Sequence, residues 1–213
     1  MKHKREIQTI AAFRWWYLVF CGAALLLLGS FYLDAAAEGW IAQNQNAALR
    51  YFMEAVSRFG DWPSHVAVGI ILLGLAFWRR DKKWMRIFAA MLLACVLAGI
   101  SARVIKISTG RARPNVQTEE EWSPPRFNAR YNAFPSGHTA SSSAFFATLA
   151  IASWRIGLGL LGIPLLIAFS RMYVGAHHLS DVVCAAILGM LAGYFVGRWM
   201  LPKTEITVAD GDA

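Results

Sequence analysis

The sequence has few charged residues: they make up 16% of 213 positions, whereas a soluble domain usually has about 25%. Glycine (17) and proline (7) are too sparse for a collagen-like or low-complexity chain. There are only three cysteines, each inside an apolar run and none in a Cys-x-x-Cys pair, so neither a disulfide framework nor a zinc site is predicted. What the chain does have is apolar residues, 57% of the total, and a mean hydropathy of +0.42. This composition indicates a protein of the lipid bilayer.

Six apolar runs predict an all-α fold, a bundle of six transmembrane helices. The first, 15–33, has no charge and is long enough to cross a hydrocarbon core of roughly 30 Å. The other five are shorter and reach the length of a span only by including polar residues at one end: 62–78, 87–102, 139–154, 156–170 and 182–196. We predict a single membrane domain over residues 1–203, followed by a short disordered cytoplasmic tail over 204–213.

The positive charges indicate how the chain is oriented. The short loop 79–83 contains four basic residues, and positive charge stays on the cytoplasmic side of a membrane. This places the N-terminus in the cytoplasm and predicts a multi-pass protein of the cell (inner) membrane. The net charge of +8 alone would suggest nucleic acid, but the charges follow the topology, so no nucleic-acid partner is predicted.

Three further segments are predicted to have structural roles. The chain start resembles a signal peptide ending at 35–37, but its apolar run exceeds the ~7–15 residues of such signals, so we expect an uncleaved first span. Segment 40–59 has apolar residues at steps of three and four and predicts a short amphipathic helix on the outer surface, without chemistry. A close helix contact is predicted in the last span by three glycines at every fourth position: Gly189, Gly193 and Gly197.

Three polar patches interrupt the apolar pattern, and six spans would put all of them on the outer face. The first extends from Lys106 to Arg113 and Pro114, and the second is Pro135-Ser136-Gly137-His138. The third starts at Ser170-Arg171 and continues with His177 and Asp181. Each patch alone has a plain structural explanation: snorkelling cations, a helix cap, or an interfacial His–Asp pair one turn apart. An uncompensated arginine at the end of a span, such as Arg171, is harder to explain in this way.

Together the patches supply what a site for a tetrahedral oxyanion needs. Three cations can hold the oxygens: Lys106, Arg113 and Arg171. A Ser-Gly turn before a helix offers backbone N–H groups, and two histidines with a carboxylate offer a nucleophile and an acid. The run of acidic residues 119–121 is the one carboxylate cluster, and it is predicted to be a solvated loop face rather than a metal site.

Lys-x6-Arg-Pro, Pro-Ser-Gly-His and Ser-Arg-x5-His-x3-Asp resemble the three signatures of the type-2 phosphatidic acid phosphatase superfamily. The match is complete at every motif position: Lys106, Arg113, Pro114, Ser136, Gly137, His138, Arg171, His177 and Asp181. The signatures cover residues 106–181, and the six-span plan extends the likeness to nearly the whole chain. A second histidine, His178, follows His177, but the spacing to Arg171 and Asp181 selects His177.

The resemblance implies a metal-independent lipid phosphatase that needs no cofactor. In it, Lys106, Arg113 and Arg171 hold the phosphoryl oxygens with help from Ser136 and the Gly137 N–H. His177 attacks phosphorus and becomes a phosphohistidine, and Asp181 fixes the tautomer of its ring. His138 protonates the leaving oxygen and then activates water. This assignment agrees with the general chemistry of these groups.

Several alternatives remain open from the sequence. The protein could be a phosphatase or a phosphotransferase that passes the group to another lipid; a vanadate haloperoxidase and a transporter with a phosphate gate are disfavoured. The small size and short loops resemble those of compact bacterial members of the family. This resemblance favours undecaprenyl diphosphate or a glycerophospholipid monophosphate, such as phosphatidylglycerol phosphate or phosphatidic acid, as the substrate. Lipid A is not excluded. The sequence leaves the oligomeric state open.

Overall fold

The structure is a computed structural model that describes residues 2–123, 125 and 127–202, with side chains from Trp15 onward. The tail predicted over 204–213 lies outside the described residues. Within them the chain is helical, has no strand, and forms one isolated bridge between Arg111 and Trp122. The helices are α1 (Lys2–Gln43), α2 (Ala47–Phe59), α3 (Trp62–Trp78), α4 (Lys82–Thr109), the 3-10 turn η1 (Ala129–Tyr131), α5 (Gly137–Ala152), α6 (Trp154–Leu160), α7 (Gly162–Tyr173) and α8 (Leu179–Met200). The predicted all-α class is therefore found in the described chain.

Local signals in the sequence set the ends of these helices. Asp61 caps α3 and Asp81 caps α4, each accepting a backbone N–H of the first turn. Ser136 caps α5 in the same way. These side chains satisfy N–H groups that a helix leaves without an intrahelical partner. At the other end of α4, Gly110 has φ 58°, a left-handed conformation that glycine adopts without strain and that ends the helix.

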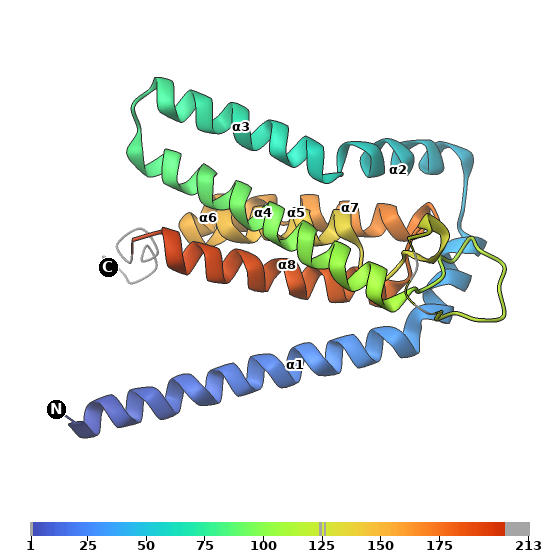
Figure 1. The fold of residues 1–213 in the computed structure, drawn as a ribbon, viewed down its shortest axis with the longest axis horizontal. Coiled ribbons are helices and arrows are strands. Elements are labelled where there is room, and N and C mark those ends of the chain that lie inside the picture. Colours follow the sequence, from blue (N-terminus) through green and yellow to red (C-terminus); the bar gives the residue numbers. More distant parts are fainter. Residues whose placement is uncertain (1, 124, 126, 203–213) are drawn as a thin grey trace.

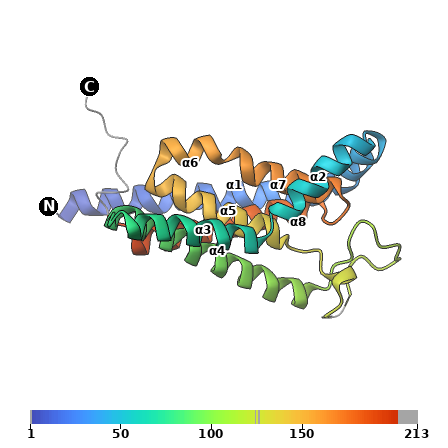
Figure 2. The same ribbon diagram turned by 90° about the horizontal axis from the view of Figure 1, so that it is seen from above.

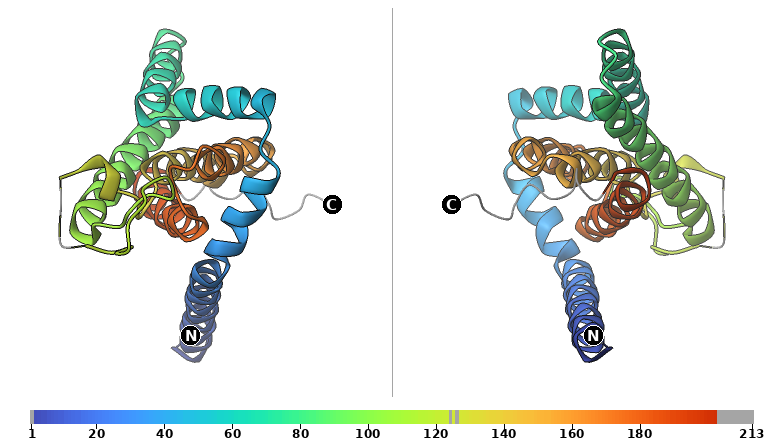
Figure 3. Two further views of the ribbon diagram at one scale, coloured as in Figure 1. Left: turned by 90° about the vertical axis from the view of Figure 1, so that its right-hand side faces the viewer. Right: turned by 90° about the vertical axis from the view of Figure 1, so that its left-hand side faces the viewer.

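Helices α4, α5 and α8 form the centre of the bundle. Alanines make up half of the buried apolar residues in this core, and glycines of α8 pack on α5, so the backbones approach closely. A Cβ on Gly189 would lie 2.4 Å from the Ala140 carbonyl oxygen, and one on Gly193 would lie 2.9 Å from that of Ala144. The predicted glycine contact of the last span is confirmed, and its partner is α5. Figure 2 shows α6 and α7 on the side of α5 away from α4, and the end-on views in Figure 3 show α1 and α3 at opposite sides of the molecule.

Fewer segments than predicted meet the length and hydropathy of a membrane span. Four segments are long and apolar enough to cross a membrane: 15–43, 82–109, 154–173 and 179–200. A fifth is added if α2 and α3, which meet at an angle of 56°, form one bent span. Each of the six predicted runs falls on helical structure, but α5 has only 16 residues and lies inside the bundle. The structure therefore supports a multi-span membrane fold, while the count of six stays a prediction.

Two boundaries differ from the prediction. α1 continues as a 42-residue helix to Gln43, so the start of segment 40–59 belongs to α1 and only 47–59 forms the amphipathic α2. The run 156–170 is interrupted near Leu161, where α6 ends and α7 begins.

At the level of the whole bundle, the long loop between α4 and α5 lies at one end, and the N-terminus and the α3–α4 turn lie at the other (Figure 1).

Candidate active site

His177 and Asp181 form a deeply buried pair at the start of α8. His177 lies in the turn between α7 and α8, and Asp181 is in the first turn of α8. The side chains are 1% and 0% exposed, and His177 Nδ1 lies 3.4 Å from Asp181 Oδ2. At this distance the two side chains are in close contact, but His177 Nδ1 has no hydrogen-bond partner among the described residues. Burial lowers the pKa of His177 to about 3, even though Asp181 acts in the opposite direction. The imidazole is therefore neutral around pH 7, as a nucleophile must be.

Arg111 holds Asp181 in place, and its role was not predicted. The guanidinium is 1% exposed and donates to Asp181 Oδ1 at 2.6 Å, to Ser180 Oγ at 2.6 Å and to Asp34 Oδ2 at 2.8 Å. It also binds Glu121, a member of the acidic run predicted to face solvent. Because the other oxygen of Asp181 accepts the backbone N–H of His178 at 2.8 Å, the carboxylate is fixed from both sides. It thus faces His177 in one orientation.

Two acidic residues of α1 also reach this region. Asp34 accepts the backbone N–H of Ser180 at 2.8 Å and its hydroxyl at 2.6 Å, in addition to binding Arg111. Glu38, one turn further on, contacts His178 Nδ1. His178 Nε2 lies 3.1 Å from the carbonyl oxygen of Ala112. The first helix is therefore tied to the start of the last helix and to the loop that carries the first patch.

The three predicted cations gather around His177. Lys106 is in the last turn of α4, Arg113 is in the following loop, and Arg171 is near the end of α7. Their positive charges act on one another, and those of Lys106 and Arg171 also act on His177. In the described part of the chain, Arg113 Nε and Arg171 Nε are buried donors without an acceptor. Unpaired buried donors of this kind suit an anion such as phosphate.

Helix α2 also contributes to the site, because the hydroxyl of Ser57 accepts a hydrogen bond from the guanidinium of Arg171. Ser57 is buried on the face of α2 that packs towards α7. The segment 40–59 was expected to play no part in the chemistry. The structure instead gives it a supporting function, since Ser57 restricts where Arg171 can point.

The second patch forms the N-terminus of α5. Ser136 is fully buried, and its oxygen accepts hydrogen bonds from the N–H and the hydroxyl of Thr139. Its own N–H donates to the Asp181 carbonyl oxygen at 3.1 Å, which joins this patch to the third one. A Cβ on Gly137 would lie 4.0 Å from Lys106 Nζ, so the start of α5 lies beside the first patch. The three patches therefore meet at one end of the bundle.

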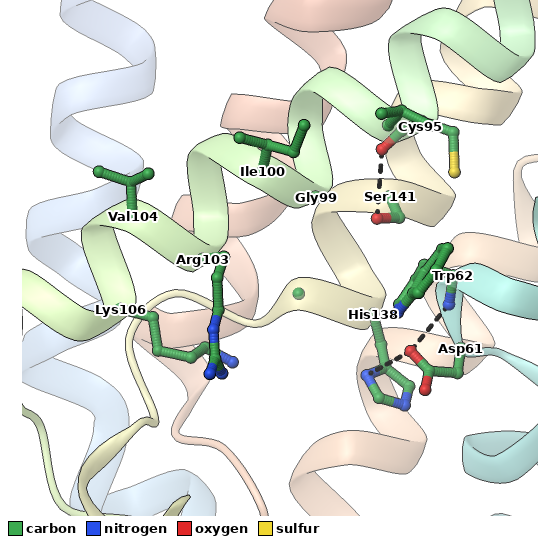
Figure 4. A pocket seen from close by; sticks show the side chains of 12 residues that line it. Asp61, Trp62, Cys95, Gly99, Ile100, Arg103, Val104, Lys106, His138 and Ser141 are labelled. Carbon is green, nitrogen blue, oxygen red and sulfur yellow. Dashed lines mark hydrogen bonds and ion pairs between the residues drawn. The ribbon is translucent and has the colours of Figure 1, made fainter. Parts of the chain in front are cut away.

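His138 lies on the wall of a cavity of about 580 Å³ that extends from the site along α4 (Figure 4). Lys106 and Gly137 line the cavity near His138, and Cys95, Val96 and Ile100 line its apolar part. The His138 side chain is 20% exposed, and its Nδ1 lies 3.5 Å from Asp61 Oδ1. A cavity with ionic groups at one end and apolar walls at the other fits an amphipathic ligand.

All eight predicted site residues are thus found in one region, and five further residues support them: Asp34, Glu38, Ser57, Asp61 and Arg111. Arg111 had a local signal, because it lies between Lys106 and Arg113 in the first patch. Across the described residues, no group of three His, Cys, Asp or Glu side chains is arranged to hold a metal ion.

The family model of the PAP2 superfamily matches residues 83–205, more than half of the chain. The chain belongs to the PAP2 superfamily. Its relatives include a protein named lipid A 1-phosphatase from Rhizobium etli, 28% identical, with 92% of this chain and 86% of that one covered. Another is named undecaprenyl-diphosphatase, from Sulfolobus acidocaldarius, 29% identical, with 75% of this chain and 71% of that one covered. The protein is therefore a membrane phosphatase of the PAP2 superfamily, as its motifs predict.

Two solved structures share the fold. The PAP2-type phosphatidylglycerolphosphate phosphatase of Bacillus subtilis superposes with a TM-score of 0.65 at 20% identity, covering 86% of this chain and 94% of the other. LpxE of Aquifex aeolicus superposes with a TM-score of 0.58 at 24% identity, covering 78% and 95%. At these identities the superpositions establish the arrangement of the helices for this PAP2 protein and nothing further.

Proposed function

We propose that this PAP2 protein hydrolyses a phosphate or diphosphate monoester of a membrane lipid through a phosphohistidine intermediate, without a metal ion or another cofactor. The observation that carries the proposal is the buried His177–Asp181 pair beside three cations, two of which have a buried donor without a partner in the described part of the chain. Phosphoryl transfer depends mainly on positioning and on stabilisation of charge, and cations supply both.

In the first half of the reaction, Lys106, Arg113 and Arg171 bind the phosphoryl oxygens, together with Ser136 and the Gly137 N–H. His177 attacks phosphorus through Nε2, since Nδ1 faces Asp181. As the P–N bond forms, the ring gains positive charge, which the Asp181 carboxylate stabilises. The P–O bond to the lipid breaks at the same time, and His138 gives a proton to the leaving oxygen.

In the second half, water replaces the lipid oxygen. His138, now neutral, takes a proton from the water, and the resulting hydroxide attacks phosphorus. The P–N bond breaks, the electron pair returns to His177, and inorganic phosphate leaves. One histidine thus acts first as an acid and then as a base, while the cations remain in place throughout.

For the substrate, the cavity beside His138 supports a lipid with its phosphate at the cations and its apolar part along α4. Undecaprenyl diphosphate, phosphatidylglycerol phosphate and phosphatidic acid all have this form. The relative from Rhizobium etli, whose match covers 92% of this chain, adds lipid A 1-phosphate as a second candidate of equal standing.

We further infer that the site faces the periplasm or the exterior. The basic α3–α4 turn lies at the end of the bundle opposite to the site (Figure 1), and positive charge marks the cytoplasmic side. A lipid in the outer leaflet of the inner membrane could then bring its phosphate to the cations while its chains stay in the bilayer.

The test is phosphate release from a panel of these lipids by purified protein in detergent, with EDTA present throughout. We expect release from at least one lipid, none from the His177→Ala variant, and inhibition by vanadate. Vanadate adopts the trigonal-bipyramidal shape of the transition state and should bind more tightly than phosphate. A strict requirement for added Mg²⁺ would contradict the proposal.

A further inference from the structure

Asp61 lies at the corner between α2 and α3, and several contacts fix its position. Its side chain accepts the Trp62 N–H at 2.8 Å as the cap of α3, and its carbonyl oxygen lies 3.0 Å from His65 Nδ1. The preceding residue is Gly60, where a Cβ would lie 2.7 Å from Ile167 of α7. No larger residue fits this approach without displacing its neighbours. The corner is therefore held against α7, and Asp61 is held with it.

α3 is also attached to α5, the helix that carries His138. The His65 ring meets Phe145 and Phe146 edge to face, with ring centroids 5.5 and 6.1 Å apart. Such contacts favour one relative placement of the two helices. They help to set the separation between Asp61 on the α3 side and His138 on the α5 side. Figure 4 shows the Asp61 carboxylate directed at the His138 ring across the edge of the cavity.

We propose that Asp61 is a positioning residue for His138: its carboxylate accepts a hydrogen bond from Nδ1–H and so leaves Nε2–H for the leaving oxygen of the substrate. The inference deepens the proposed function and rests on the role given there to His138 as general acid. Its ground is the 3.5 Å separation between Asp61 Oδ1 and His138 Nδ1. Catalytic hydrogen bonds are commonly long before the substrate binds and tighten in the complex.

The chemistry requires such a partner. To act as an acid, His138 must carry hydrogen on both ring nitrogens and direct one of them at the lipid oxygen. When the P–O bond breaks, the Nε2 proton moves to that oxygen, and the electron pair of the N–H bond stays on the ring. The neutral ring keeps Nδ1–H on Asp61, so Nε2 is free to take the proton of the attacking water. A carboxylate at Nδ1 thus serves both half-reactions.

The surrounding charges make the contribution of Asp61 more important. Burial acts most strongly against a positive charge on His138. Arg171 of α7, Lys106 of α4 and His65 of α3 add to this effect, and Asp61 acts in favour of the charge. The first two are needed to bind phosphate and cannot be moved away. The Asp61 carboxylate partly offsets these effects and so favours the protonated ring that a general acid requires.

The experiment compares Asp61→Asn and Asp61→Ser with Asp81→Asn in full-length protein. Asn and Ser are both good helix caps, so the variants keep the cap of α3. Asp61→Asn removes the negative charge, and Asp61→Ser leaves a side chain too short to contact His138. Asp81→Asn is the matched control, because Asp81 caps α4 through the N–H groups of Lys83 and Trp84 at the opposite end of the bundle.

On a lipid phosphate, both Asp61 variants should lower kcat about 10-fold, a share of the roughly 10²–10⁴-fold that general acid catalysis supplies. KM should stay nearly constant, because Asp61 does not hold the phosphate. The burst of nitrophenolate from p-nitrophenyl phosphate should change little, since this leaving group needs no proton. In Asp61→Asn the alkaline limb of kcat/KM on the lipid should move to lower pH, because the imidazolium has lost its stabilising charge.

The His138→Ala variant separates failure of this inference from failure of the proposed function. If His138→Ala shows no dependence on the leaving group, His138 is not the general acid and the proposed function itself is wrong at this residue. If His138→Ala shows the dependence while both Asp61 variants behave like Asp81→Asn, Asp61 is only a helix cap and the inference alone is overturned. If the proposed function and this inference are both correct, adding Asp61→Asn to His138→Ala should cause no further loss of kcat on the lipid.

Discussion

At the scale of single residues, His177 and His138 have different roles in the proposed reaction, and kinetics can separate them. His177→Ala should abolish turnover of every phosphate ester, because no covalent intermediate can form. His138→Ala should lose about 10²–10⁴-fold on a lipid substrate, the usual range for a general acid. With p-nitrophenyl phosphate, the same variant should give a rapid burst of nitrophenolate and accumulate an acid-labile phosphoenzyme. A burst from His177→Ala instead would mean that the two roles are exchanged.

Arg111 should matter for stability more than any cation of the phosphate site. Replacing it with methionine leaves two buried carboxylates, Asp34 and Asp181, without their cation. Breaking one buried ion pair from one side costs about 3–5 kcal/mol, so the Arg111→Met variant should unfold in detergent at a clearly lower temperature. Arg198→Met, which removes an exposed arginine from α8, is the control. Equal unfolding temperatures for the two variants would show that the Arg111 network adds no stability.

His178 gives the fold a pH dependence whose sign follows from its partners. Glu38 and the Ala112 carbonyl can only accept hydrogen bonds, so both ring nitrogens must carry hydrogen. Burial lowers the pKa of His178, but these partners outweigh it and the pKa is raised above 6.5. The stabilisation is therefore complete below pH 6.5 and is lost as the pH rises through the folded value.

The measurement is the difference in unfolding temperature between the native protein and His178→Gln as a function of pH. It should be largest below pH 6.5 and shrink at higher pH. Glu38→Gln should show the same trend, because it removes the other half of the pair. A difference that stays constant or grows with rising pH would be inconsistent with a protonated His178.

At the scale of helices, the contact between α5 and α8 controls the distance between the second and third patches. Gly189→Ala would place a Cβ 2.4 Å from the Ala140 carbonyl oxygen, so α8 has to move away from α5. Overpacking of this kind costs about 1–3 kcal/mol, and activity should fall as well, because α5 starts at the phosphate site and α8 carries Asp181. Gly74→Ala in α3 is the control, since nothing lies within 4 Å of that position. Similar stability and activity in both variants would contradict this account.

The helices also show what sequence patterns can predict. Apolar runs located every main helix, because burial in lipid demands a continuous apolar segment. They did not predict that α1 continues to Gln43, since the last part of this helix has polar residues that bind protein rather than lipid. They also missed the interruption near Leu161, because an apolar run continues through it. Gly162 and Pro164 are the local signal for this break, since proline has no N–H to donate to the preceding helical turn.

For the site, motif spacing located the residues that face the phosphate but not the residues that hold them. Arg111 and Asp34 are 77 positions apart in the chain, and Ser180 and Asp34 are 146 apart. Such bonds follow from how helices pack, and no local pattern encodes them. One feature of Asp34 and Glu38 is visible in the sequence: their four-residue spacing puts two acids on one face of a helix just after an apolar run.

At the scale of the whole molecule, the orientation in the membrane is the property to test. Single cysteines at Gln117 and at Lys82 lie at opposite ends of the bundle, and both positions are exposed. An impermeant maleimide added to intact cells should label position 117 and spare position 82, because only the site end faces outward. The unmodified protein, with its three native cysteines, sets the background. Labelling of position 82 alone would invert the topology.

The link from α1 through Arg111 to α8 has a consequence for biosynthesis. A ribosome makes Asp34 first, Arg111 later, and Ser180 and Asp181 after both. Until the last helix is made, Asp34 is available as a counter-ion for Arg111, so the nascent chain need not carry this arginine unpaired. When α8 inserts, its first turn brings Ser180 to Asp34 and Asp181 to Arg111. The chain thus acquires its His177–Asp181 pair only after the other residues of the site have been made, and a ribosome-bound fragment that stops before residue 180 has no complete site.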